Sequence, residues 1–357
     1  MFVLGVRAIG LSGFLSLCAA VHGPAASLRA TTDSPFGAEA SGASFGRISQ
    51  LINALPSVET ALEAYWPGFW TSTCGFVVAD SDGLALLFIP SARRPEKARP
   101  ACGTTSWAKV SNDSLPVLLH GRVFEASVPS LAGTSPLLRP NFDAGGRNVL
   151  AVSRKGSYVE ALEFAIHETF HQFQEGRFAR LIGLNDLVSD SIVDDSLFRR
   201  NVEIERVMLQ NVLLARSTKA TRALATRYLR ARRARLSLVS QRVEQVERLM
   251  ERKEGTAEIV GLYALAAAEK RPLVSTVRDS TIALLKRPLE QFPEGMDRTW
   301  RLMRWRLYGT GAALGLVLTR LHVPWKGQVQ QGAGLDEILE RALRPLEPEE
   351  RSHPRQD

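Results

Sequence analysis

One five-residue segment constrains the fold and chemistry of this chain more than any other: His167-Glu168-Thr169-Phe170-His171. Two histidines four positions apart on a helix lie one turn above each other, so both imidazoles can reach one metal ion. The glutamate beside the first histidine lies close enough to act on a water at that ion. This spacing is the H-E-x-x-H zinc signature, in which the glutamate is the general base of a hydrolase. The segment predicts two zinc ligands, His167 and His171, and a base, Glu168.

The residues around this motif predict a helix. Ser157 and Glu160 have the spacing of a capping box, which starts a helix, and Gly176 can end it. Between these limits apolar side chains recur at helical spacing: Val159, Leu162, Ile166, Phe170 and Phe173. Such a stripe buries one helix face against a core. The segment 148–153 just upstream indicates a short strand that leads into the helix.

A catalytic zinc needs a third protein ligand and an open fourth position for water. The histidines outside the motif and the N-terminal region lie in no matching pattern: His120, His322 and His353. A glutamate is therefore the better third ligand. Lys253-Glu254-Gly255-Thr256-Ala257 resembles the Asn-Glu-Gly-x-Ala segment of gluzincins, including the aminopeptidase N type, in which the glutamate binds zinc. The resemblance implies Glu254 as the ligand, with a glycine after it that lets another helix or the metal approach closely.

The spacing between the ligands departs from that family, and two other glutamates stay open as the third ligand. Glu254 follows His171 by 83 positions (254 − 171), much more than in the aminopeptidases. Glu258 lies one helical turn beyond Glu254, where it could bind the metal or support a ligand. Glu205 lies on an amphipathic helix that could pack beside the motif. The alternative for each of these glutamates is an ordinary solvated charge.

A longer resemblance covers roughly residues 60–345. A group of uncharacterised exported bacterial zincin-like proteins shows the same order of landmarks: Trp66-Pro67-Gly68, the H-E-x-F-H-x-x-Q segment from His167 to Gln174, Glu205, Glu254 to Ala257, Tyr308 to Ala313, and Pro324-Trp325-Lys326. The resemblance implies a zincin-like helical region with a hydrolase-like site, and it names no substrate. It also suggests Tyr308 as the donor that stabilises an oxyanion, with core packing as the alternative. Ile259 departs from the group, which has an aromatic residue there.

The N-terminal residues predict export. Arg7 is the only charge before an apolar run from Ala8 to Val21, which has the proportions of a signal peptide over residues 1–26. An uncleaved anchor is the alternative. We therefore expect a secreted or periplasmic bacterial protein without a transmembrane helix once the signal is removed. Of the three cysteines, Cys18 leaves with the signal, and Cys74 and Cys102 form an even pair that predicts one disulfide, or else two buried thiols.

The remaining chain predicts an α+β fold that is mainly helical. A segment rich in small residues, 27–45, is expected to be a flexible leader. An N-terminal α+β part follows at 46–150, with a small β-rich portion where short apolar runs alternate with turn residues. From Ser157 onward almost all of the sequence has helical character, which predicts a helical, zincin-like metal-binding domain at 151–345. Residues 346–357 form a charged tail.

The chain carries a formal charge of +8, and part of it is concentrated in one segment. Nine basic residues lie between Arg216 and Arg242 without an intervening acid. Such a stripe could contact an anionic surface, although a solvated helix face is the favoured interpretation. No motif for specific nucleic-acid binding accompanies it. The chain also lacks a phosphate-binding Gly-Lys-Ser/Thr loop and the Gly-x-Ser-x-Gly elbow of serine hydrolases.

The sequence therefore predicts an exported zinc-dependent hydrolase, metallopeptidase-like, that acts on a peptide or amide. Zn²⁺ held by His167, His171 and Glu254 activates a water, and Glu168 takes its proton. One alternative is a non-enzymatic binding or envelope protein with structural zinc closed by a fourth side chain such as Glu205. Another is an anionic-surface binder that uses the basic helix 216–242.

Overall fold

The computed structural model describes residues 41–72, 158–179, 195–286 and 301–344. Between the first two ranges it also describes 75–79, 84–89, 108–109, 115, 120, 122–127, 139–143 and 148–153. The predicted signal peptide, both cysteines of the expected disulfide and the charged tail lie outside these residues.

Helices make up most of the described chain, which confirms the mainly helical character. They are α1 (Ser41–Tyr65), α2 (Phe69–Ser72), α4 (Tyr158–Arg177), α5 (Ser196–Leu214), α6 (Thr218–Leu236), α7 (Gln241–Met250), α8 (Thr256–Ala268), α9 (Leu273–Lys286), α11 (Arg306–Arg320), α12 (Lys326–Gln330) and α13 (Leu335–Leu343). Two π-helical turns, η7 (Glu251–Gly255) and η8 (Arg301–Trp305), precede α8 and α11. Helix α1 begins at Ser41, inside the segment 27–45 for which a leader was expected.

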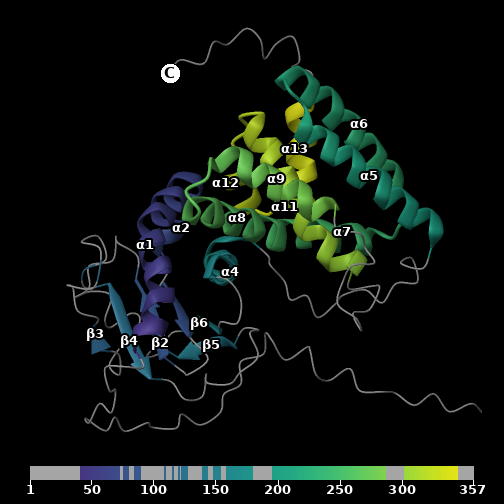
Figure 1. Ribbon diagram of the computed structural model, residues 1–357. Coiled ribbons are helices and arrows are strands. Elements are labelled where there is room, and N and C mark those ends of the chain that lie inside the picture. Colours follow the sequence, from purple (N-terminus) through teal and green to yellow (C-terminus); the bar gives the residue numbers. More distant parts are fainter. Residues whose placement is uncertain are drawn as a thin grey trace, which may run out of the picture.

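A mixed sheet lies at one end of the molecule, at the lower left of Figure 1. Its strands run in the order β3-β4-β2-β1-β6-β5, with bounds β1 (Phe76–Ala79), β2 (Leu84–Phe88), β3 (Ala108–Lys109), β4 (Val123–Ser127), β5 (Arg139–Asp143) and β6 (Asn148–Ser153). Strands β1 and β6 are parallel, with Val77 opposite Ala151, and the other pairs are antiparallel. The chain passes from β6 into α4, which packs on β1 and β6 and lies between the sheet and the helices from α5 onward.

The apolar stripe of α4 is buried as its spacing predicts. Leu162, Ile166 and Phe170 are fully enclosed, and α4 packs most extensively against α8. This contact brings the motif helix against the helix that continues from η7. Gly261 of α8 permits the close approach, because a Cβ there would lie 2.9 Å from the carbonyl oxygen of Glu163.

Two landmarks far apart in the sequence meet in an aromatic cluster behind the motif. The ring of Trp66 lies edge-on to Phe170 at 4.8 Å and to Trp325 at 5.4 Å between centroids. Gly68 turns the chain after Trp66 with a φ of +79°, a conformation that glycine adopts without strain. The Nζ of Lys326 lies 3.8 Å from the ring centroid of Tyr65. The cluster ties α1 and α12 to the apolar face of α4.

Across the described ranges, no helix combines the length and the apolarity that a membrane crossing requires.

Candidate metal centre

Helix α4 presents the two motif histidines side by side. They lie four residues apart on the flank of the buried stripe, so their rings leave the same side of the helix one turn apart. The ring centroids are 4.9 Å apart and nearly perpendicular. Only 6% of the His167 side chain and 13% of the His171 side chain are exposed, so both nitrogens that face the site are shielded from bulk water.

Glu254 approaches these histidines from the facing helix. It lies in η7, the π-helical turn between α7 and α8, and its side chain is 2% exposed. Gly255, the next residue, allows α11 to pack directly on this turn, because a Cβ there would lie 2.7 Å from the carbonyl carbon of Gly311. The expectation that Gly255 serves a close helix approach is therefore confirmed. This contact holds the turn that carries the buried Glu254 directly against α11.

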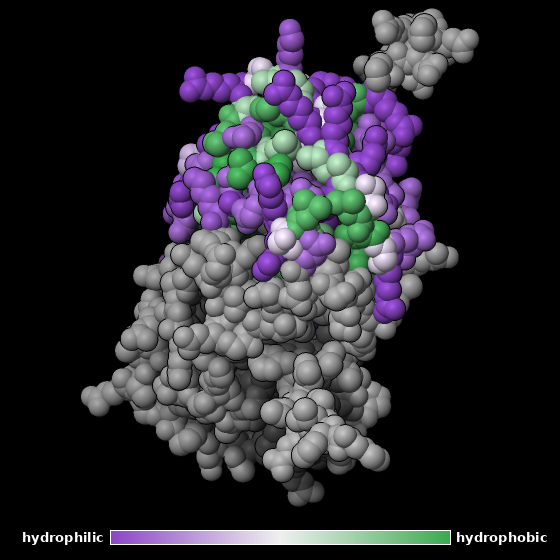
Figure 2. All heavy atoms as spheres, turned by 90° about the vertical axis from the view of Figure 1, so that its right-hand side faces the viewer, coloured by the Kyte–Doolittle hydropathy of each residue, from purple (hydrophilic) through white to green (hydrophobic). Residues whose placement is uncertain are grey.

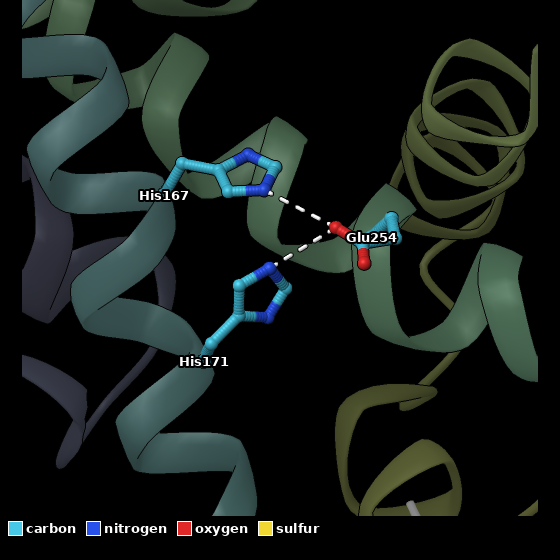
Figure 3. A group of neighbouring side chains, drawn as sticks. All are labelled: His167, His171 and Glu254. Atoms are coloured by element: carbon cyan, nitrogen blue, oxygen red, sulfur yellow. Dashed lines mark hydrogen bonds and ion pairs between the residues drawn. The ribbon is translucent and has the colours of Figure 1, made fainter. Parts of the chain in front are cut away.

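The three side chains converge on one point, as Figure 3 shows. The Oε2 atom of Glu254 lies 3.5 Å from Nε2 of His167 and 3.1 Å from Nε2 of His171. All three potential ligand atoms lie within 4.8 Å of one another, so this group could hold a metal ion. Among the described residues, no other group of three His, Cys, Asp or Glu side chains has this geometry.

The far side of each imidazole is also engaged. Nδ1 of His167 lies 3.1 Å from Oε2 of Glu258, and Nδ1 of His171 lies 2.7 Å from Oε1 of Gln174. Both partners are acceptors, so both Nδ1 atoms donate to them. Neutral imidazoles oriented in this way would turn their Nε2 lone pairs toward a metal ion bound at the centre. Donation from a ligand histidine to a carboxylate or carbonyl is the usual support of a metal site.

Gln174 connects the two halves of the centre. While its Oε1 accepts from His171, its Nε2 donates to the carbonyl oxygen of Lys253 at 2.8 Å and to Oγ1 of Thr256 at 2.7 Å. One fully buried amide therefore orients a histidine and anchors the turn that carries Glu254. Of the two roles considered for Glu258, the structure shows the supporting one: it accepts from His167 and is not one of the three potential ligands.

The charges around the centre favour a cation. Burial lowers the pKa of His167, but hydrogen bonds with Glu254 and Glu258 outweigh it and raise this pKa to about 10. Burial alone would raise the pKa of Glu254, yet the two histidines and Arg304 hold it well below its usual range. Carboxylates that stabilise an imidazolium proton would equally stabilise a divalent cation in the same place.

No family model, no curated protein and no solved structure matches this chain.

Tyr308 lies at the centre, and Glu168 acts on the centre through its charge. Glu168 is half-buried, and its negative charge acts on His167 and on Arg304. The ring of Tyr308 stacks on that of His167 at 5.5 Å with an angle of 11° between planes. Burial raises the pKa of Tyr308 well above its usual value, and the charge of Glu254 raises it further, so the hydroxyl stays protonated at neutral pH.

Arg304 and Trp305 of η8 also contact Tyr308, and neither was predicted from the sequence. Nη2 of Arg304 lies 3.4 Å from Oε1 of Glu254 and 3.5 Å from the Tyr308 hydroxyl. Trp305 stacks on Tyr308 at 5.2 Å and is 38% exposed. The only signal in the sequence was their position one turn before Tyr308, because residues three and four apart share a helix face.

Glu205 does not reach the centre. It is buried and paired with Arg235, with 2.6 Å between Oε1 and Nε. Arg235 also binds Glu247, and Arg232 binds Glu251 and Asp336. The interpretation of the basic run 216–242 as a solvated helix face therefore holds for only part of it, because Arg232 and Arg235 are buried. Figure 2 faces the side of the molecule on which α5 and α6 lie in Figure 1, and hydrophilic side chains with hydrophobic groups among them cover its coloured part.

Proposed function

We propose that the chain is an exported zinc-dependent hydrolase of the zincin type, gluzincin-like, that acts on a peptide or amide bond. One observation carries the proposal: two Nε2 atoms and a carboxylate oxygen converge, while both Nδ1 atoms donate to supporting acceptors. Acceptors behind both imidazoles are the usual support of histidines that bind a metal. Export rests on the N-terminal sequence alone.

Zinc is the metal that this donor set suits. Two imidazoles and one carboxylate are the ligand set of many catalytic zinc sites, in which the fourth position receives water or substrate. Within the described residues, no further carboxylate, histidine or cysteine joins these three side chains as a fourth ligand. Glu205, the side chain considered for a closed structural site, is bound to Arg235 instead. This arrangement favours a catalytic over a structural zinc.

Each residue of the site has a role in such a reaction. Bound zinc would acidify a water and polarise the substrate carbonyl. Glu168 would accept a proton from the attacking water and return it to the leaving nitrogen. The protonated Tyr308 hydroxyl and the Arg304 guanidinium would be the donors that stabilise negative charge on the carbonyl oxygen.

The substitution Glu168→Gln tests this mechanism. It keeps size and shape, so fold and zinc content should persist, while hydrolysis of a pooled peptide library should fall by at least about 10²-fold. Glu175→Gln is the matched control, because Glu175 is an exposed carboxylate two turns further along α4. Cleavage that is unchanged by Glu168→Gln would refute Glu168 as the base. A zinc-loaded wild type that cleaves nothing would favour the binding or envelope role.

A further inference from the structure

Four glutamates on one helix serve two different purposes. Glu247, Glu251, Glu254 and Glu258 are spaced four, three and four residues apart, which on a regular α-helix places them all on one face. In the structure the first two bind buried arginines, Arg235 and Arg232. The last two face the histidines of α4. The direction in which these glutamates point therefore changes between Glu251 and Glu254.

The π-helical turn explains this change of direction. The chain stays helical from Gln241 to Ala268, because residues 251, 255 and 256 all keep right-handed helical dihedral angles. A π turn accommodates one extra residue in the helix. Since each residue of an α-helix turns the chain by about 100°, the residues after η7 are rotated by roughly that angle against those before it. Glu258 beyond η7 and Glu254 within it accordingly face the histidines of α4, away from the arginines that bind Glu247 and Glu251.

The start of this turn is held by a buried clamp. Arg232 donates to both carboxylate oxygens of Glu251, at 2.7 and 2.8 Å, and Oγ1 of Thr310 donates to Oε1 at 3.0 Å. The Arg232 and Glu251 side chains are 2% and 0% exposed, so water cannot replace either partner. Arg232 is itself fixed by Asp336 of α13 at 3.1 Å.

We propose that Arg232 is a positioning residue for the metal centre. By holding Glu251, the first residue of η7, against α6 and α11, it fixes the π turn in place and so aims Glu254 at the two histidines. The inference rests on the proposed zinc function, although Arg232 contacts none of the three ligand side chains. It predicts that a guanidinium on the basic helix α6 controls metal affinity.

Arg232→Met and Arg235→Met form a matched pair for the test. Both remove a buried guanidinium bound to two carboxylates, but Arg235 binds Glu205 and Glu247 and no residue of η7. The Kd for Zn²⁺ would be measured by competition with a chromophoric chelator on the full mature chain, and folding by circular dichroism. We expect Arg232→Met to weaken Zn²⁺ binding about 10- to 100-fold, as changes that misorient a ligand do. Arg235→Met should stay within a few-fold of wild type.

The visible spectrum of bound Co²⁺ is a second readout that loss of stability alone would not move. Arg232→Met should alter this spectrum because Glu254 is displaced, whereas Arg235→Met should keep it. If wild type binds Zn²⁺ and the two variants bind it equally well with one spectrum, the positioning role is refuted and the zinc site stands. A wild type that binds no Zn²⁺ would overturn both.

A milder pair keeps the test decisive where the arginine variants do not fold. Thr310→Val removes one hydrogen bond to Glu251 and keeps the shape of the side chain. Thr281→Val is its control, because that buried hydroxyl donates to the carbonyl oxygen of Val277 in its own helix, α9. A weaker Zn²⁺ affinity in Thr310→Val alone supports the clamp, and equal affinities contradict it.

Discussion

The substitution Gly255→Ala tests whether close packing of η7 on α11 supports the metal centre. The φ of Gly255 is −65°, so alanine fits the backbone, and any loss of stability must come from lack of space. A Cβ at this position would lie 2.7 Å from the carbonyl carbon of Gly311 and 2.9 Å from the nitrogen of Ala312. Ordinary contacts of a Cβ begin near 3.4 Å. The two helices must therefore separate by roughly half an ångström or more, against backbone atoms that cannot rotate away.

Overpacking of this kind costs about 1–3 kcal/mol of unfolding free energy. Because Glu254 is the adjacent residue, the displacement should also weaken Zn²⁺ binding by roughly 10-fold or more. Urea denaturation would measure the first effect, and chelator competition the second. Gly176→Ala is the control, since nothing lies within 4 Å of its Cβ and alanine favours helix by up to about 1 kcal/mol. A Gly255→Ala protein with wild-type stability and wild-type Zn²⁺ affinity would refute the packing argument.

Three further predictions follow from the supporting contacts, the buried ion pairs and the cysteines. Gln174→Leu removes the acceptor for His171, so Zn²⁺ affinity should fall about 10- to 100-fold, whereas Gln174→Glu keeps an acceptor; equal affinities for these two variants would contradict the role. Burial raises the pKa of Glu247, but Arg235 and Arg306 outweigh it and hold the pKa at about 2, below the usual 4.5. Its contribution to stability, up to roughly 3 kcal/mol, is therefore complete above pH 4.5 and lost as the pH falls toward 2. Between these pH values the unfolding free energy of Glu247→Gln should change less with pH than that of wild type. An equal pH dependence of the two proteins would argue against the pairing. The exported protein should contain no alkylatable thiol before reduction, and two reactive thiols would disprove the disulfide.

The sequence predicted the centre of the site because its signals are local. Two histidines four apart need only a helix to share a face, and the apolar stripe supplied that helix. Glu254 came from a short segment that resembles gluzincins, and the structure brings it beside both histidines. Gly255 indicated a close helix approach, and Gly311 is the partner that the structure supplies.

The parts that the sequence did not predict depend on contacts between distant segments. The four glutamates from 247 to 258 have the spacing of one continuous α-helical face, so the π turn that divides them has no periodic signal. In the sequence, Arg232 and Arg235 look like the other basic residues of the run 216–242. They differ only in the carboxylates from other helices that bind them in the structure. An arginine is buried only where such partners meet it, which a linear pattern cannot show.

Zinc content after removal of Glu254 tests the central claim most directly. Elemental analysis of purified mature protein should find about one zinc per chain in wild type, because two imidazoles and a carboxylate form a zinc ligand set. Glu254→Ala should carry little or none, while Glu258→Gln, which keeps an acceptor for His167, should retain most of it. Full zinc occupancy in a folded Glu254→Ala protein would contradict the account, as would wild type without zinc.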